Sequence, residues 1–455
     1  MNETLKQAFD FQTQGNFREA ERIYNQLLKE TPNDVQVLNL LARIKLDEKM
    51  FHESLTINNK ILKLDKNNEN ALFESAIALK NLGDLEEAIE LYSRVIELNP
   101  KNIKAYYNLG AIYADYGDVE KSIYNFNKVL ESNPDDVDTR YFIALSYFKN
   151  KQYKNGLPYF ESRLCRKSSF MTQLHTYPNL MKNAQLWQGQ HVPDKTIYTY
   201  YEAGFGDVLM YSRYLSLLQE RCERIIFKPQ QPLAELFKEN FPNIYVMDYF
   251  EPEKKIHFDY HIPMLSLPLA LGLDDNTIFT SNKIYLKANQ EKVKSYHERF
   301  FDNKCFKIGI KWQGNVTYDL ERVIDVSQFI RLFQIPNTKF YSFQTFDGSE
   351  RIEDLRKHYD ITDIGKTLTN FSDTAGAIEN LDLVISNDTS LVHIAGAMGK
   401  PCWVLLPYLY NWRWHQDLSK CDWYDTVKPF RQPTPGDWTS VFDVLYEQLK
   451  EIVSK

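Results

Sequence analysis

The residues best suited to chemistry form a polar turn at Ser386–Ser390, between an apolar run and a helical pattern that Gly399 ends. A second apolar run, Cys402–Leu406, follows, so the stretch has the strand–helix–strand order of one βαβ unit. Asp388 or Thr389 would cap the helix, with the first unbonded backbone N–H groups just after it. Those groups and the helix dipole attract anions. We therefore predict a phosphate seat for a nucleotide at this turn.

A second candidate is Asp207, in a glycine-rich stretch that follows a strand pattern at Lys195–Glu202. A carboxylate in a loop at the end of a parallel strand could take a proton from an acceptor hydroxyl. It could equally cap the helix expected at about residues 208–221. Gly204 and Gly206 allow close backbone approach to a ligand, but they do not complete a GxGxxG pattern. The residues alone leave both roles of Asp207 open.

The elements that would position these residues are strands and helices that alternate from residue 195 to the end of the chain. Alternation favours parallel sheets, whose ligand sites lie at the carboxyl ends of the strands. We expect two α/β domains, residues 195–290 and 300–436, and a closing helix at 437–455.

Residues 1–160 repeat with a period of 34, as Gly15, Gly83 and Gly117 and the prolines Pro32, Pro100 and Pro134 show. Each unit reads as two helices with a tight turn between them, and Lys49 replaces the glycine in the second unit. The pattern resembles the tetratricopeptide repeat (TPR). Stacked repeats form an α-superhelix whose concave groove usually binds peptide or protein, although they could also fix an oligomeric state. Residues 161–194 lose the period and are predicted to be a connector.

Composition excludes several classes of function. The net charge of −7 argues against non-specific binding of nucleic acid. The five cysteines are scattered without a CxxC pair, which predicts a reducing compartment and no structural metal. The longest apolar stretch, Ile262–Leu273, is broken by prolines and too short to span a membrane. The first residues lack the pattern of a secretion signal, so we expect a cytoplasmic location.

Several ordered motifs between residues 195 and 440 match one family. They are GFGD with Arg213 and Tyr214 downstream, FDYHIPMLSLPLALG, IGIKWQGN with Glu321 and Arg322 downstream, FYSFQ, DTAGAIENLDLVISNDTSLVHIAGAMGKPCWVLLP, NWRWHQ and FRQPTPGDW. With these motifs the chain resembles the heptosyltransferase-like glycosyltransferases of the GT-B fold, in the bacterial branch fused to TPR repeats. The resemblance implies a TPR α-superhelix followed by two Rossmann-like α/β domains that face a cleft. It also implies an inverting enzyme that needs no bound metal or other cofactor.

The resemblance assigns roles to the two candidate loops. The family's aspartate in the glycine loop of the acceptor-binding domain matches Asp207, which favours the general base over the helix cap. Its diphosphate-binding turn in the donor-binding domain matches Asp388, Thr389 and Ser390. The family commonly has glycine where this chain has Ser390, so the resemblance does not specify a heptose donor.

Further residues could contact the donor. His393 lies one helical turn after Thr389 and could reach the sugar or phosphate, or pack in the core. Lys311 and Arg322 could neutralise the diphosphate, although Lys311 could also be a solvated strand end.

Five other candidates on the donor side also have two possible roles each. Gln344 could bond the base or ribose, or cap the turn after its strand. Trp312 could stack on base or sugar, as could Trp412 and Trp414, but packing is the alternative for each. Arg413 could clamp a phosphate or form a surface ion pair.

The sequence thus predicts a glycosyltransferase that moves a sugar from a nucleotide-sugar donor to an acceptor hydroxyl, on a protein or peptide presented by the TPR groove. One alternative is an enzyme of cell-surface glycan or lipopolysaccharide assembly. Another is a non-catalytic TPR scaffold with a degenerate GT-B half. Neither a nucleic-acid partner nor a membrane span is expected, and the repeats could support a homo-oligomer.

Overall fold

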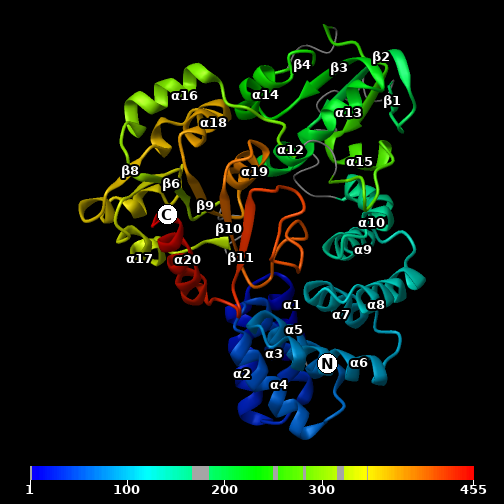
Figure 1. Ribbon diagram of the computed structural model, residues 1–455. Coiled ribbons are helices and arrows are strands. Elements are labelled where there is room, and N and C mark those ends of the chain that lie inside the picture. Colours follow the sequence, from blue (N-terminus) through cyan, green and yellow to red (C-terminus); the bar gives the residue numbers. More distant parts are fainter. Residues whose placement is uncertain are drawn as a thin grey trace. The chain divides into compact units, whose positions relative to one another are not determined.

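A computed structural model describes residues 3–166, 184–249, 255–279, 283–314, 322–345 and 347–454. The chain divides into two compact units, Met1–Ser146 and Tyr147–Lys455. Figure 1 colours them from blue to red along the sequence. The predicted repeat region, residues 1–160, therefore extends past this division into the second unit. Helix α10 (Tyr153–Phe160) belongs to the second unit, because the Tyr153 ring lies 5.9 Å from the ring of Trp423.

The first unit consists of paired helices. Their bounds are α1 Glu3–Thr13, α2 Phe17–Glu30, α3 Val35–Asp47, α4 Phe51–Leu64, α5 Glu69–Leu82, α6 Leu85–Leu98, α7 Ile103–Tyr116, α8 Val119–Ser132 and the first part of α9, Val137–Lys149. Small residues at one repeat position, Ala20, Ser54, Ala88 and Ser122, are fully buried between the helices of each pair. This arrangement is the predicted TPR α-superhelix.

The turn inside each repeat has left-handed backbone. Residues 34 apart have positive φ angles: Gly15 (77°), Lys49 (62°), Gly83 (93°), Gly117 (76°) and Lys151 (59°). The two lysines keep a conformation that costs an L-residue about 1 kcal/mol or more. Packing of the repeat therefore overrides the local preference, and the second repeat keeps its geometry without its glycine.

The first α/β domain of the second unit is a parallel sheet with the strand order β1-β5-β2-β3-β4. Its strands are β1 Gln185–Leu186, β2 Val192–Tyr200, β3 Cys222–Lys228, β4 Tyr245–Val246 and β5 Tyr260–Pro263. Its helices include α12 Phe205–Tyr211, α13 Leu215–Gln219, α14 Ala234–Asn240 and α15 Leu267–Ala270. The helix expected at about residues 208–221 is split, because a 3₁₀ turn at Ser212–Tyr214 separates α12 from α13.

The second α/β domain is a parallel sheet with the order β11-β10-β9-β6-β7-β8. Its strands are β6 Phe306–Lys311, β7 Thr338–Ser342, β8 Ile361–Asp363, β9 Leu383–Asn387, β10 Cys402–Leu406 and β11 Val427–Arg431. Its helices are α16 Gln290–Tyr296, α17 Ile330–Phe333, α18 Phe371–Glu379, α19 Ser390–Ala397 and α20 Trp438–Val453. Numbered along the chain from β6, the order is 3-2-1-4-5-6, that of a doubly wound Rossmann sheet.

The predicted connector at residues 161–194 lies partly outside the described residues. Its described ends are a 3₁₀ turn, η1 (Glu161–Cys165), and strand β1. Both ends are built into the first α/β domain: β1 pairs with β5, and the Arg163 guanidinium binds Glu202 after β2.

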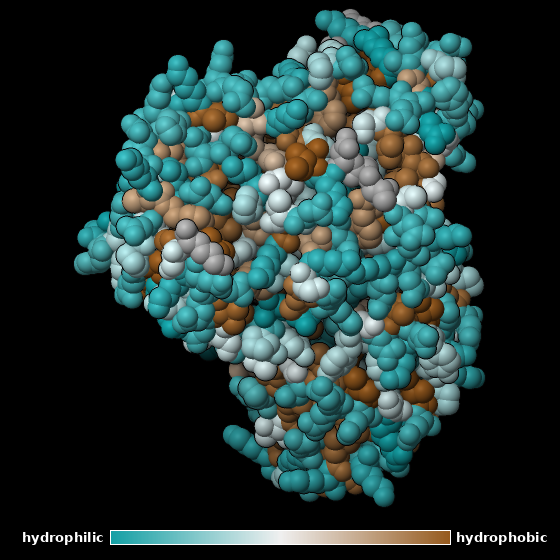
Figure 2. Space-filling view, viewed as in Figure 1, coloured by the Kyte–Doolittle hydropathy of each residue, from teal (hydrophilic) through white to brown (hydrophobic). Residues whose placement is uncertain are grey.

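Hydrophilic residues dominate the face drawn in Figure 2, with apolar residues in small groups. Within the described residues, no helix combines the length and apolar composition needed to cross a bilayer.

Candidate active site

The predicted phosphate turn lies at the point where the order of the strands along the second sheet reverses. Strand β6 is flanked by β7 on one side and by β9 on the other. The loop after β6 therefore leads toward one edge of the sheet, and the loop after β9 leads toward the other edge. Ligands of such sheets bind at this switch point, outside the carboxyl ends of the strands. Helix α19 begins there at Ser390, after the turn that follows β9. The turn therefore lies at the carboxyl end of β9, beside the switch point of the sheet.

No side chain in the described part of the chain caps the N-terminus of α19. Thr389 occupies the N-cap position with extended backbone, but its side chain makes no capping hydrogen bond. Its Oγ1 instead lies 3.1 Å from Ser386 Oγ. The first N–H groups of α19 therefore retain the ability to bind an anion.

Arg322 holds the buried carboxylate of Asp388. Its Nη1 lies 3.2 Å from Asp388 Oδ2 and 3.3 Å from the Asp388 carbonyl oxygen. The side chain of Asn387 donates a hydrogen bond to the Arg322 carbonyl oxygen over 2.8 Å, which fixes the segment against the turn. The negative charge of Asp388 is therefore balanced beside the helix N-terminus.

Lys311 ends β6, directly beside Ser386 of β9 in the sheet register. Its Nζ lies 3.4 Å from the carbonyl oxygen of Phe343, and none of the described carboxylates forms an ion pair with it. Burial lowers its pKa from 10.5 to about 8. Lys311 is thus a partly dehydrated cation at the switch point, and it is not the solvated strand end that the sequence left open.

Trp312 and Gln344 serve the structure of the domain, contrary to their predicted contact with the donor. The Trp312 ring is fully buried in the core of the second sheet. Gln344 is also buried; its Oε1 accepts a hydrogen bond from the Gln313 N–H over 3.2 Å, and its Nε2 donates to the Asp347 carbonyl over 2.9 Å. Both side chains are enclosed because the loops after β6 and β7 pack on each other.

His393 is buried on α19 between aromatic rings. Its ring stacks on Trp414 at 5.7 Å, and its Nδ1 lies 3.0 Å from the Tyr424 hydroxyl. Burial lowers its pKa to about 4, although the carboxylate of Asp388, 4.0 Å from Nε2, acts in the opposite direction. The ring is therefore neutral at pH 7, and it packs beneath the phosphate turn.

The glycine loop meets α19 at His393. A β-carbon placed on Gly206 would lie 2.7 Å from His393 Cδ2, which is closer than side chains pack. Gly206 is therefore needed for the close approach of α12 to α19. Gly204 has ordinary extended backbone, and a β-carbon there would meet only the Asp207 carboxylate at 3.5 Å.

Asp207 makes two contacts. Its Oδ2 accepts a hydrogen bond from the Gly204 N–H over 3.1 Å, as a helix cap would, and its Oδ1 forms an ion pair with Arg413. Arg413 also donates to Asn411 Oδ1 over 2.6 Å and stacks over the Trp412 ring at 4.6 Å. The predicted phosphate clamp thus faces the predicted base, which lies on the other α/β domain.

Arg213 is an interdomain residue that the sequence marked only as part of a motif. Its buried guanidinium donates a hydrogen bond to the Trp423 carbonyl over 3.0 Å. The rings of Tyr285, Trp423 and Tyr424 surround it, with centroids 5.0–5.3 Å away. The one sign of this role in the sequence is the arginine that follows the glycine loop. Its aromatic partners could not be predicted, because they come from distant parts of the chain.

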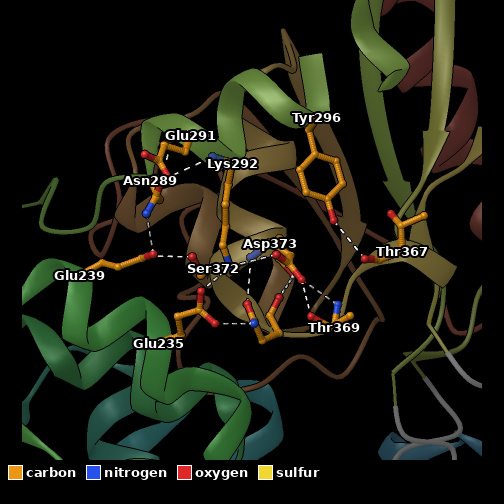
Figure 3. Close-up of polar contacts among 12 residues, drawn as sticks. Glu235, Glu239, Asn289, Glu291, Lys292, Tyr296, Thr367, Thr369, Ser372 and Asp373 are labelled. Carbon is orange, nitrogen blue, oxygen red and sulfur yellow. Dashed lines mark hydrogen bonds and ion pairs between the residues drawn. The ribbon is translucent and has the colours of Figure 1, made fainter. Parts of the chain in front are cut away.

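Polar side chains also join α14 of the first α/β domain to the second domain (Figure 3). Glu239 accepts a hydrogen bond from Ser372 over 2.7 Å, and Glu235 accepts one from Asn370 over 2.7 Å. Lys292 lies 2.6 Å from Glu235. Together with the contact of α12 and α19, these bonds hold the glycine loop and the predicted phosphate turn close to each other.

Comparisons with known proteins agree with both halves of this description. Family models for tetratricopeptide repeats match residues 5–69, 78–117 and 103–136, and the model for glycosyltransferase family 9 (heptosyltransferase) matches residues 337–405. The chain carries TPR repeats and a segment similar to glycosyltransferase family 9. That segment runs from β7 to β10 and contains the phosphate turn and His393, but neither Asp207 nor Arg413. The match supports a glycosyltransferase, and the repeats support a role in binding protein.

Solved structures similar to the chain include TPR proteins. They include MamA (27% identity, 34% of this chain and 92% of that chain, TM-score 0.33), MamA of Desulfovibrio magneticus RS-1 (20%, 37% and 99%, 0.34) and a tetratricopeptide repeat protein of Parabacteroides merdae (23%, 36% and 67%, 0.33). No curated protein is a detectable relative by sequence. Among the described residues, no group of three or more histidine, cysteine, aspartate or glutamate side chains is arranged to hold a metal ion.

Proposed function

We propose that this protein is an inverting glycosyltransferase that moves a sugar from a nucleotide-sugar donor to a hydroxyl of a protein or peptide, without a bound metal. The observation that carries the proposal is the juxtaposition of two loops. Asp207 stands at the start of α12 in one α/β domain, and α12 packs on α19, whose N-terminus is the phosphate turn of the other domain.

The donor side would bind the diphosphate. As the bond between sugar and phosphate breaks, negative charge develops on the departing phosphate. The N–H groups at the start of α19 and the cations Lys311 and Arg322 would stabilise that charge. Asp388 would remain paired with Arg322 and hold this cation beside the turn.

The acceptor side would supply the base. The Asp207 carboxylate would take the proton of the acceptor hydroxyl, whose oxygen then forms a bond to the anomeric carbon as the nucleoside diphosphate leaves from the opposite face. The Gly204 N–H and Arg413 would orient the carboxylate. This assignment gives Arg413 a role in orienting the base, in place of the predicted phosphate clamp.

The test is Asp207→Asn, with release of nucleoside diphosphate measured over a panel of nucleotide sugars. We expect donor affinity within about 2-fold of wild type and turnover lower by about 100-fold or more, the usual contribution of a general base. Asp194→Asn, which neutralises an exposed carboxylate of the same domain, is the control. Full turnover in Asp207→Asn would remove Asp207 as the base. A wild-type protein that neither binds nor cleaves any donor would contradict the enzyme itself.

The proposed binding site for the protein acceptor is a hollow on the surface of the first helices of the repeats. A cavity of about 550 Å³ there is lined by Phe9, Val35, Gln36, Asn39, Leu40 and Asn70. The buried Oδ1 of Asn39 has no hydrogen-bond partner among the described residues, although its Nδ2 donates to the Val35 carbonyl. A side-chain carbonyl of this kind could accept a bond from the N–H of an extended peptide.

The full-length variant Asn39→Ala/Asn70→Ala tests this binding site. We expect transfer to a protein acceptor to fall while transfer to a small hydroxyl acceptor is unchanged. Asn25→Ala, an exposed asparagine on α2, is the matched control. An equal loss of both activities, or no loss, would argue against acceptor binding in this hollow.

A further inference from the structure

The loop between β10 and β11, residues 407–426, is named here the tryptophan loop. It contains no helix or strand, yet its aromatic residues form a core: Tyr410, Trp412, Trp414, Trp423 and Tyr424 are all buried. Loops longer than about 12–15 residues without secondary structure are usually functional when they are ordered. The contacts on its two sides indicate what this loop does.

One side of the tryptophan loop packs on α10 and the end of α9. The rings of Phe148 and Phe160 lie 5.0 Å and 6.4 Å from the Trp412 ring. Lys149 Nζ lies over the Tyr410 ring at 4.5 Å. Residues that the 34-residue period assigns to the last repeat therefore support a loop of the donor-side domain.

Polar groups fix the same contact at one register. The Tyr153 hydroxyl lies 2.9 Å from His415 Nε2, and His415 Nδ1 lies 3.1 Å from Asp422 Oδ2. Lys151 Nζ lies 2.5 Å from the same Asp422 oxygen. The hydrogen bond to His415 lowers the pKa of Asp422 well below its usual range, so this carboxylate is charged. This series of contacts begins at Tyr153 and ends at Lys151, and both residues belong to the last repeat of the 34-residue period.

The other side of the tryptophan loop meets the proposed site. Arg413 forms the ion pair with Asp207, Trp414 stacks on His393, and the Tyr424 hydroxyl lies 3.0 Å from His393 Nδ1. One loop thus contacts α10 on one side and both α12 and α19 on the other.

We propose that Tyr153 and Lys151 are positioning residues for glycosyl transfer: through His415 and Asp422 they hold the tryptophan loop so that Arg413 orients Asp207. The last helix of the repeat region then helps to position the groups of the transfer site, in addition to any role in binding an acceptor. This inference rests on the proposed function, since Asp207 acts as the base in both.

Tyr153→Phe in the full-length protein removes the hydroxyl and keeps the packed ring. Tyr159→Phe is the matched control, because it makes the same change on the same helix, outside this chain of hydrogen bonds. We expect amide exchange of residues 407–426 to quicken about 10-fold in Tyr153→Phe alone. The thermal midpoints of the two variants should lie within about 3 °C of each other, since one hydrogen bond is lost.

The kinetic readout separates positioning from general support of the fold. We expect kcat for nucleoside diphosphate release, measured with a donor that wild type cleaves, to fall about 10-fold or more in Tyr153→Phe, with KM for that donor unchanged. A misplaced catalytic group lowers turnover, whereas the phosphate turn that binds the donor is untouched. Equal kcat in the two tyrosine variants would overturn the proposal, as would equal exchange of the loop.

A second pair of variants guards against misfolding of Tyr153→Phe. Lys151→Asn removes the cation from Asp422 and supplies a residue that tolerates the left-handed backbone at position 151. Lys154→Asn removes a neighbouring exposed charge as its control. Faster loop exchange and lower kcat only in Lys151→Asn would support the proposal, and identical behaviour of the pair would refute it. If no donor is cleaved by wild type, the proposed function fails, whereas loop exchange still tests the structural link.

Discussion

The two parallel sheets of the second unit have the same strand order around their switch points. They differ in the side chains that lie at those switch points. In the first sheet, the point lies between β2 and β5, and Arg163 enters it: its Nη2 lies 2.8 Å from Glu202 Oε1 and 2.7 Å from Ser266 Oγ. Glu202 also accepts a hydrogen bond from the Leu265 N–H over 3.0 Å. In the second sheet, between β6 and β9, Lys311 forms no ion pair with a described carboxylate.

The difference separates a crevice whose charges are paired within the chain from the crevice that we propose binds a ligand. Burial of a charge is costly unless a partner of opposite charge is present. At the first switch point, the chain supplies both charges, so no ligand is needed. At the second, a partly buried lysine and a helix N-terminus that no described side chain caps lie together, and an anionic ligand would supply the charge that the described residues do not. We therefore expect one nucleotide site in this unit rather than two.

Arg163→Met should have the largest effect, and we expect it to lower the stability of the fold without weakening the binding of nucleoside diphosphates. Both side chains of the pair are buried, so the variant leaves the Glu202 carboxylate without its cation. Loss of one partner of a buried pair costs about 3–5 kcal/mol. All seven tryptophans of the chain lie in the second unit, so tryptophan fluorescence during urea unfolding reports on this unit alone.

The control is Arg163→Met/Glu202→Gln, which removes both charges and should recover part of the lost stability. Folded Arg163→Met should bind nucleoside diphosphates as wild type does. Weaker binding with unchanged stability would show that the first switch point is also a ligand site, and the contrast between the two sheets would be lost.

His393 gives the second sheet an acid sensitivity. Its folded-state pKa is about 4, against 6.5 for an exposed histidine. As the pH falls from 6.5 to 4, the unfolded chain takes up a proton that the folded chain does not. About 3 kcal/mol of stability is therefore lost across this window. The measurement is urea unfolding, followed by tryptophan fluorescence, at several values between pH 7 and pH 4.

His393→Gln should flatten this dependence, even if it lowers stability at every pH through lost stacking on Trp414. The matched variant of the first sheet is His261→Gln, since burial on β5 also lowers the pKa of His261. The same slope in wild type and His393→Gln would mean that His393 does not resist protonation in the folded state.

Features set by local sequence were predictable. The repeats follow from a period that fixes glycines, prolines and small residues, and the switch-point turn follows from the Asp388–Ser390 motif after an apolar strand. These patterns act within one helix or one turn. Even where the pattern broke, at Lys49, neighbouring repeats imposed the same backbone.

Features set by distant contacts were not predictable. Whether Trp312 and Gln344 point to a ligand or into the core depends on how the loops after β6 and β7 pack. The Arg413–Asp207 pair joins residues 206 positions apart. Tyr153 keeps the repeat pattern but binds His415 in the tryptophan loop, so the last predicted repeat reaches into the second compact unit.

Lys311→Met should have the smallest effect, and it tests the second switch point directly. A charge-assisted hydrogen bond to a phosphate is worth about 10-fold or more in affinity, so the variant should bind nucleoside diphosphates about 10-fold more weakly. Isothermal titration with ADP, GDP and UDP provides the measurement. Because the pKa of Lys311 is about 8 in the unliganded protein, wild-type affinity should fall as the pH rises through 8, when the lysine loses its charge.

Lys311→Met should lack that fall, and this pH dependence is what separates a direct charge contact from a general disturbance of β6. Lys307→Met, on the same strand away from its carboxyl end, is the control and should keep both the affinity and the pH dependence of wild type. If Lys311→Met binds all three nucleotides as wild type does, the partly buried Lys311 is not a phosphate ligand. The second switch point would then depend on the N-terminus of α19 and on Arg322 alone.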